Sequence, residues 1–448
     1  MSNRGLGDAK PLPSPSDTAE GRLPDGLIPR IAWLRSSRLV KQNLVLFAGG
    51  LTAGVGGFVY HSIAGHLMGP SLYGDVVSLI ALYAIFTTPT LIVILVLARY
   101  SATLVASGTT DSVRYLMVRS TQLTLIPSLL VILAGFLLAK PTADFLHLHS
   151  PIPVIWLGVA IAVFWQVGIP RGILQGIQRF SALSANLSLE ALIRCGALAL
   201  LLAAGTGVTG ATAAVLVGVA FAYLFGIYSL RAQFRAGGER AQLRSMLGFL
   251  LTATVGTFGI LLLYNLDVLL AKHYLTLHDA GIYGSLNKIG TILYFLTVSV
   301  SQVMFPRVVE ALASNNHPGR LLGVSAALMG LLGAGALLVF GLLPGLVVRL
   351  LFGASFGDGQ NYVFLIGVIG LALSLSNLLV QFSMAAHDPW FIPLLAGAVL
   401  MLTLSIVYYH AGVGAVVTDV LGTMLTLLAT LTIRLLFLLP RLKPVAPL

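Results

Sequence analysis

Apolar stretches of about 20 residues or longer follow one another along almost the whole chain. Residues 181–203, SALSANLSLEALIRCGALALLLA, are one of them. A helix needs about 20 mostly apolar residues to cross the hydrocarbon core of a bilayer. With 57% hydrophobic and only 9% charged residues among 448, the chain is far more apolar than a soluble protein of this length. The pattern therefore predicts an all-α integral membrane protein.

A scan at this length predicts about twelve transmembrane helices. Their approximate limits are 41–68, 73–98, 116–138, 152–173, 181–203, 208–230, 246–270, 279–304, 320–341, 361–384, 389–409 and 412–437. The boundaries are least certain around residues 342–360, which mix apolar residues with a glycine-rich stretch. That segment fits either an outer hairpin or a re-entrant piece.

The distribution of Lys and Arg orients these helices. If the N-terminus is cytoplasmic, 21 of the 26 basic residues fall on the cytoplasmic side, and only Lys140, Lys272 and Arg349 fall outside. Arg194 and Lys288 lie within spans. Basic residues concentrate in cytoplasmic loops, so both termini are predicted to be cytoplasmic. The same distribution explains the net charge of +11 without a nucleic-acid partner.

The two halves of the chain show a weak internal repeat. A shift of 207 residues aligns Ala64, His66, Gly74, Ser78 and Leu79 with Ala271, His273, Gly281, Ser285 and Leu286. Six spans per half, an even number, would give both halves the same orientation, related by an axis along the membrane normal. The repeat predicts two pseudo-symmetric six-helix lobes around a central cavity.

These observations divide the chain into four parts. Residues 1–38, rich in Pro, Gly, Ser and charge, are expected to be a disordered cytoplasmic tail, without the apolar core of a secretory signal peptide. Residues 39–231 form the N-terminal lobe, 232–245 a cytoplasmic linker and 246–448 the C-terminal lobe.

Neither an enzyme nor a metal protein is expected. The single Cys195 leaves no disulfide framework or thiolate cluster, and nothing near His147, His149 and Asp144 completes a tetrahedral metal site. Metalloprotease and phosphate-loop motifs are absent from the sequence, and the outer loops are short and nearly uncharged. We therefore expect no catalytic residues and no cofactor.

Four stretches of the chain resemble the polysaccharide transporter family of the multidrug/oligosaccharidyl-lipid/polysaccharide flippase superfamily. They are IAGHLMGPSLYGDVVSLIALY, RGILQGIQRFSALSANLSLEALIR, YNLDVLLAKHYLTLHDAGIYGSLNKI and LLFGASFGDGQNYVFLIGVIGLALSLSNLL. Together with the twelve spans, the resemblance covers nearly everything after residue 40. It implies two lobes that alternate between inward and outward access.

The resemblance also implies a substrate and a location. A protein of this family would move an undecaprenyl-diphosphate-linked oligosaccharide to the outer leaflet of a bacterial or archaeal plasma membrane. A polysaccharide polymerase and glycosyltransferases would be further partners. Two alternatives stay open: a cation-coupled multidrug antiporter of the sister family, and a lipid II flippase, although that branch usually has fourteen spans. A third possibility is a non-transporting scaffold in a polysaccharide assembly complex.

Charged residues inside the predicted spans are the candidate functional groups. A charge at the centre of a membrane helix costs roughly 2.5–3.5 kcal/mol on insertion scales, so it should face a cavity or a partner. Glu190 and Arg194 share one face of a helix at i and i+4. Either Arg194 binds the substrate diphosphate and Glu190 tunes it, or the two form a self-neutralising pair.

Two more intramembrane charges lie in the C-terminal half. Asp267 is a candidate for coupling transport to H⁺ or Na⁺, or for an ion pair with Lys288, which is itself a candidate cavity cation. Asp75 and Asp419 are expected at the outer interface. Pro89 interrupts the second span, where it can bend the helix.

Arginines near the cytoplasmic ends of the spans form a second group of candidates. The group comprises Arg99, Arg171, Arg179 and Arg307. The positive-inside bias explains them without a specific role. Alternatively, Arg99, Arg171 and Arg307 bind the anionic lipid headgroup, because guanidinium groups match phosphate oxygens. His66 and His273, at matched positions of the repeat, are expected to be interfacial residues.

Overall fold

The computed structural model describes residues 38–107, 112–231, 247–313 and 318–441, and every regular element in them is helical. The helices of the first half are α2 (Arg38–Thr87), α3 (Pro89–Ala106), α4 (Ser112–Leu137), α5 (Ala139–Phe145), α6 (Ile152–Gly176), α7 (Phe180–Ala203) and α8 (Gly207–Ser229). Those of the second half are α9 (Leu247–Tyr274), α10 (Leu277–Ala313), α11 (Gly319–Leu342), α12 (Pro344–Phe352), α13 (Val363–Ala385), α14 (Phe391–Tyr408) and α15 (Val413–Leu438), with 3₁₀ segments η2 (Ala354–Tyr362) and η3 (Leu439–Arg441).

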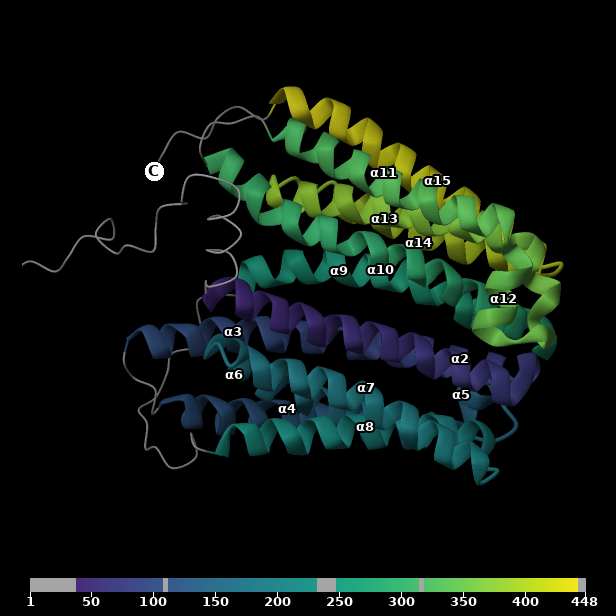
Figure 1. The fold of residues 1–448 in the computed structure, drawn as a ribbon, viewed down its shortest axis with the longest axis horizontal. Coiled ribbons are helices and arrows are strands. Elements are labelled where there is room, and N and C mark those ends of the chain that lie inside the picture. Colours follow the sequence, from purple (N-terminus) through teal and green to yellow (C-terminus); the bar gives the residue numbers. More distant parts are fainter. Residues whose placement is uncertain (1–37, 108–111, 232–246, 314–317, 442–448) are drawn as a thin grey trace, which may run out of the picture.

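Helix α2 contains a sharp reversal that divides it into two legs. Gly69 has φ 70° and ψ 175°, a conformation that L-residues with a Cβ rarely adopt, and Pro70 follows it. The first leg runs to one end of the bundle, and the second leg with α3 returns (Figure 1). The boundary between α2 and α3 falls at Thr88, directly before Pro89, which confirms the predicted interruption.

The helices account for the twelve predicted crossings. Ten stretches of the described residues are long and apolar enough to span a bilayer. The first of them, Leu44–Ala106, crosses twice because it contains the Gly69 reversal, and α9 supplies one further crossing of 28 residues. The segment 342–360 forms α12 and η2, of 9 residues each. At about 1.5 Å per residue an α-helix of that length covers only half of a bilayer core.

The two ends of the bundle differ: arginines lie near helix termini at one end, and short helical segments lie at the other. One end, here called the basic end, carries Arg99, Arg179, Arg231 and Arg434 near helix termini. The other, here called the opposite end, carries α5, α12 and η2 (Figure 1). Helices α2–α8 pack together as one lobe and α9–α15 as the other. The predicted tail and linker fall almost wholly outside the described residues.

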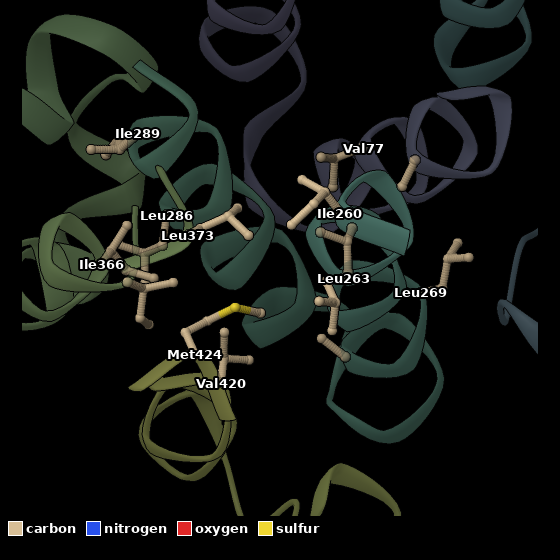
Figure 2. Close-up of a cluster of buried hydrophobic side chains, with 14 of the residues drawn as sticks. Val77, Ile260, Leu263, Leu269, Leu286, Ile289, Ile366, Leu373, Val420 and Met424 are labelled. Atoms are coloured by element: carbon tan, nitrogen blue, oxygen red, sulfur yellow. The ribbon is translucent and has the colours of Figure 1, made fainter. Parts of the chain in front are cut away.

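Buried aliphatic side chains fill the C-terminal lobe and continue to its border with α2. Ile366 and Leu373 of α13, Met424 of α15 and Leu286 of α10 belong to this core (Figure 2). Val77 of α2 belongs to the same core, and it comes from the other lobe. The second leg of α2 therefore links the two lobes by apolar contact.

The two lobes meet at a symmetric pair of glycines. A Cβ atom added to Gly281 would lie 1.9 Å from the carbonyl oxygen of Pro70, and one added to Gly74 would lie 3.3 Å from that of Leu277. Pro70 and Gly74 correspond to Leu277 and Gly281 under the shift of 207 residues. The two contacts are therefore equivalent to each other in the repeat. Gly74 and Gly281 also touch each other directly. The contact pattern confirms the repeat at this hairpin and places its local pseudo-twofold axis between the two glycines.

Gly281→Ala is expected to destabilise the protein by about 1–3 kcal/mol, because the new methyl group must displace the Pro70 backbone. Gly330→Ala on α11 is the matched control, since a Cβ there meets nothing within 4 Å. The control should be neutral or stabilising by up to about 1 kcal/mol, the usual helix preference of Ala over Gly. Thermal unfolding of the purified proteins measures both. Equal stability of the two variants would contradict the close approach.

Candidate functional site

The strongest polar network of the N-terminal lobe joins α6, α7 and α8. Arg171 of α6 is buried, pairs with the Glu190 carboxylate through Nη2 and donates from Nε to Asn186 Oδ1 at 2.8 Å. Asn186 in turn donates to the Ala222 carbonyl of α8 at 2.6 Å. Asn186 and Glu190 are one turn apart on α7, so both face α6. Glu190 is therefore paired with Arg171 and not with Arg194.

Arg194 lies one turn beyond Glu190 and has no ion-pair or hydrogen-bond partner among the described residues. Its Nε atom is buried without a partner. The guanidinium lies 5.4 Å from the centre of the Tyr60 ring on α2, a cation–π contact. Arg171 and Glu190 neutralise each other, so the surplus positive charge of this region resides on Arg194.

Aromatic groups of α2 surround the charged residues of this lobe. Tyr83 lies within electrostatic range of Arg171, Glu190 and Arg194, and its buried hydroxyl has no partner among the described residues. His61 is 3.1 Å from the Tyr73 hydroxyl and within electrostatic range of both Arg194 and Lys288. His61 also packs edge-on against the Tyr60 and Tyr73 rings.

The C-terminal lobe holds a buried carboxylate, Asp267 of α9. It accepts hydrogen bonds from the Tyr283 hydroxyl, from Asn287 Nδ2 at 3.1 Å and from the Val268 backbone at 2.9 Å. It lines a cavity of about 20 Å³, enough for one water molecule, together with Tyr264 and residues of α10, α13 and α15. Two further buried oxygens, Tyr264 Oη and Asn287 Oδ1, have no partner among the described residues.

Lys288 does not form the expected ion pair with Asp267. No Lys288–Asp267 contact within ion-pair distance occurs in the described part of the chain, although the two charges lie close enough to interact. The Lys288 ammonium instead lies 5.5 Å from the Tyr264 ring centre. Its environment resembles that of Arg194: a cation against a tyrosine ring, next to the lobe interface.

The most deeply buried ion pair closes the lobe interface at the opposite end. Lys272 Nζ of α9 lies 2.6 Å from Asp75 Oδ1 of α2, and the two side chains are 1% and 2% exposed. Asp75 was expected at the outer interface; it lies at the opposite end of the bundle and is buried there, with Lys272 as its counter-ion. His149 lies 3.7 Å from the other oxygen of Asp75.

Sequence reasoning missed the Asp75–Lys272 pair, although a signal was present. Lys272 directly precedes His273 in the second copy of the repeated hairpin, and Asp75 directly follows Gly74 in the first. Since the two copies pack around a common axis, their flanking charges meet. His273 of α9 also contacts α5: its ring stacks on that of Phe145, with 4.2 Å between ring centres, and its Nδ1 lies 2.7 Å from the Phe145 carbonyl oxygen.

The remaining arginine candidates lie near the basic end. Arg99 and Arg307 are exposed there, on α3 and α10. Arg179 donates from Nη1 to the Ser229 carbonyl at 2.9 Å and so caps the end of α8. His66 lies beside Gly353 at the opposite end, and Asp419 of α15 has a buried oxygen without a partner among the described residues.

Lys272→Met should leave Asp75 buried and unpaired, which costs about 3–5 kcal/mol for a pair of this burial. The double variant Asp75→Asn, Lys272→Met should recover most of this loss, because it removes both charges. Thermal unfolding measures the stability. Unchanged stability of Lys272→Met would show that the pair does not hold the lobes together.

Comparison with known proteins identifies the family. The family described as polysaccharide biosynthesis proteins matches residues 39–312. No curated protein matches the chain significantly.

Solved structures share the fold at low sequence identity. An inward-facing multidrug resistance MATE family transporter is 12% identical over 87% of this chain and 95% of its own, with a TM-score of 0.73. An outward-facing one is 14% identical over 91% and 96%, with a TM-score of 0.63. A superfamily transporter from Pyrococcus furiosus, described as having a binding pocket of reverse polarity, is 14% identical over 90% and 95%, with a TM-score of 0.61.

The fold of these neighbours is the two-lobe fold of twelve helices described above. The family match covers more than half of the chain, including the whole N-terminal lobe and the first helices of the next. The chain is therefore a multi-pass membrane protein that belongs to the polysaccharide biosynthesis protein family, and it shares its fold with multidrug resistance MATE family transporters.

Proposed function

We propose that this protein is an alternating-access flippase for a lipid-linked oligosaccharide carried on a diphosphate such as undecaprenyl diphosphate. The observation that carries the proposal is the uncompensated charge of Arg194, which lies against the Tyr60 ring and has no counter-ion among the described residues. An unpaired guanidinium at membrane depth is costly unless an anion uses it. The diphosphate is such an anion.

The family and the charge balance support this substrate over a cationic drug. The family resemblance implies an anionic lipid-linked sugar as the substrate, and cations suit phosphate oxygens. The Pyrococcus furiosus neighbour, whose pocket has reverse polarity, is a precedent for a changed pocket charge on this fold. We further propose a bacterial or archaeal plasma membrane, with the basic end and both termini in the cytoplasm.

The membrane potential can drive the proposed movement without a catalytic site for ATP. One elementary charge crossing 100 mV is worth about 2.3 kcal/mol. A diphosphate that leaves a negative cytoplasm therefore moves downhill.

Because the lobes are joined at the opposite end by Gly74, Gly281 and the Asp75–Lys272 pair, the substrate would enter from the basic end. Arg99 and Arg307 are exposed there and are proposed to attract the headgroup.

Coupling to H⁺ or Na⁺ at Asp267 is a second part of the proposal. The carboxylate shares its small cavity with Tyr264 Oη and Asn287 Oδ1, two oxygens that have no protein partner among the described residues. Oxygen ligands of this kind suit a hard cation, and the carboxylate could alternatively take up a proton. A cation-coupled drug antiporter, the alternative function, would also use Asp267.

Arg194→Met and Lys288→Met should each lower lipid-diphosphate transport about tenfold or more, because each removes a charge-assisted contact worth about 1.5–3 kcal/mol. Movement of a fluorescent lipid-diphosphate sugar in proteoliposomes, with and without an imposed potential, measures this. The exposed Arg320→Met is the control for loss of a positive charge.

Substrates of the competing functions belong in the same assay. Lipid II and cationic dyes test the two alternative transporters. Transport of dyes alone would favour an antiporter. Absence of protein-dependent movement of any lipid would reject the flippase and favour a scaffold.

Asp267→Asn should abolish any dependence of transport on an H⁺ or Na⁺ gradient while leaving potential-driven transport measurable, because Asn retains acceptor capacity for Tyr283 and Asn287 but carries no charge. Gradients of each ion imposed separately across the proteoliposomes give the readout. Asp358→Asn on η2 serves as the exposed control. A variant that keeps the wild-type ion dependence would remove Asp267 from the coupling role.

A further inference from the structure

Three charges of the N-terminal lobe compete for two possible pairings. Glu190 lies four residues before Arg194 on α7, the spacing and polarity at which a carboxylate and a cation attract each other on a helix. Arg171 on α6 reaches the same carboxylate. One carboxylate can neutralise only one of the two arginines, so the choice decides which guanidinium keeps its charge.

The contacts of Arg171 favour its pairing with Glu190 over a Glu190–Arg194 pair. Its Nε donates to Asn186 Oδ1, and Asn186 is anchored to the Ala222 carbonyl of α8. The guanidinium also lies 5.7 Å from the centre of the Phe164 ring. These contacts come from α6, α7 and α8, and they orient Arg171 before any substrate binds. Glu190 is thereby drawn toward α6.

Arg194 is left without a counter-ion on the side of α7 that faces α2. Gly57 of α2 lies beside the guanidinium, since a Cβ there would be in ordinary contact with Nη2 at 3.5 Å. The base of the Arg194 side chain is packed more closely against α8, where a Cβ at Gly218 would lie 2.8 Å from Arg194 Cβ. Its charged end lies against α2, beside Gly57 and the Tyr60 ring, with no counter-ion among the described residues.

We propose that Arg171 is a positioning residue: it sequesters Glu190 and so keeps the charge of Arg194 available for the substrate diphosphate. Arg171 itself does not bind the substrate. When Arg171 is lost, Glu190 turns along α7 to Arg194 and neutralises it. The identity of the ligand rests on the proposed function. The exchange of partners, in which Glu190 moves from Arg171 to Arg194, does not depend on it.

The exchange of partners can be measured without any substrate. Glu190→Gln, Arg194→Gln and the double variant are made in the wild type and in Arg171→Met, and the unfolding temperature of all eight proteins is compared. In the wild type the two shifts should add, because the residues are not paired. In Arg171→Met they should depart from additivity by several degrees. Coupling in the wild type, or additivity in Arg171→Met, overturns the proposal.

Ligand binding provides the second readout, with farnesyl diphosphate as the probe and farnesol as its uncharged counterpart. Arg171→Met should weaken farnesyl diphosphate binding at least tenfold. Arg171→Lys, which keeps a cation for Glu190, and the double variant Arg171→Met, Glu190→Gln should both stay within about threefold of the wild type. A double variant as weak as the single one would show that Arg171 binds the anion itself, which overturns the proposal.

A matched pair separates positioning from plain stabilisation. Arg434 of α15 donates two hydrogen bonds, at 2.9 and 2.7 Å, to the buried Asp388 that follows α13. Arg434→Met should lower the unfolding temperature as Arg171→Met does, yet leave farnesyl diphosphate binding within threefold. An equal loss of binding in both variants would reduce the role of Arg171 to stability. If the wild type binds no farnesyl diphosphate, the proposed function fails, and the unfolding temperatures still decide the partner exchange.

Discussion

A charge inside the hydrocarbon layer is costly unless a partner or a ligand compensates it, and this constraint organises the polar chemistry of the protein. Among the described residues, three ion pairs of Lys or Arg link different parts of the fold: Arg171–Glu190, Lys272–Asp75 and Arg434–Asp388. Asp267 is satisfied by hydrogen bonds instead. Arg194 and Lys288 have only a tyrosine ring each, and so they remain the cations that an anionic substrate would neutralise.

The two lobes share a backbone plan and differ in chemistry. Gly74 and Gly281 are equivalent positions, and their contact requires the absence of side chains on both. The tyrosine at position 60, by contrast, corresponds to Asp267 under the same shift of 207, and Arg194 corresponds to Met401. The duplication therefore preserved the residues that let the lobes close on each other, while the buried charges diverged. One lobe carries the unpaired Arg194 guanidinium, and the other carries the cavity lined by the hydrogen-bonded Asp267.

Much of this architecture could be predicted from the sequence. Helix number, the break before Pro89 and the 207-residue repeat follow from apolar length, proline chemistry and residue identity, all of which are local. The partner of Glu190 could not be predicted, because Arg194 was the nearest cation along the chain and Arg171 is nearest only after α6 packs on α7. The partner of Asp75 was missed for the same reason. Its counter-ion Lys272 is 197 residues away in sequence.

The sequence by itself determined that the chain spans a membrane about twelve times as two repeated halves, because backbone hydrogen bonding in lipid permits little else for such apolar stretches. It also limited the functional charges to a few intramembrane residues. Only the tertiary structure decided which of those charges cancel, since pairing depends on distances of a few ångströms between helices and not on spacing along them. Arg194 is left without a counter-ion because Arg171 pairs with Glu190 once α6 packs on α7.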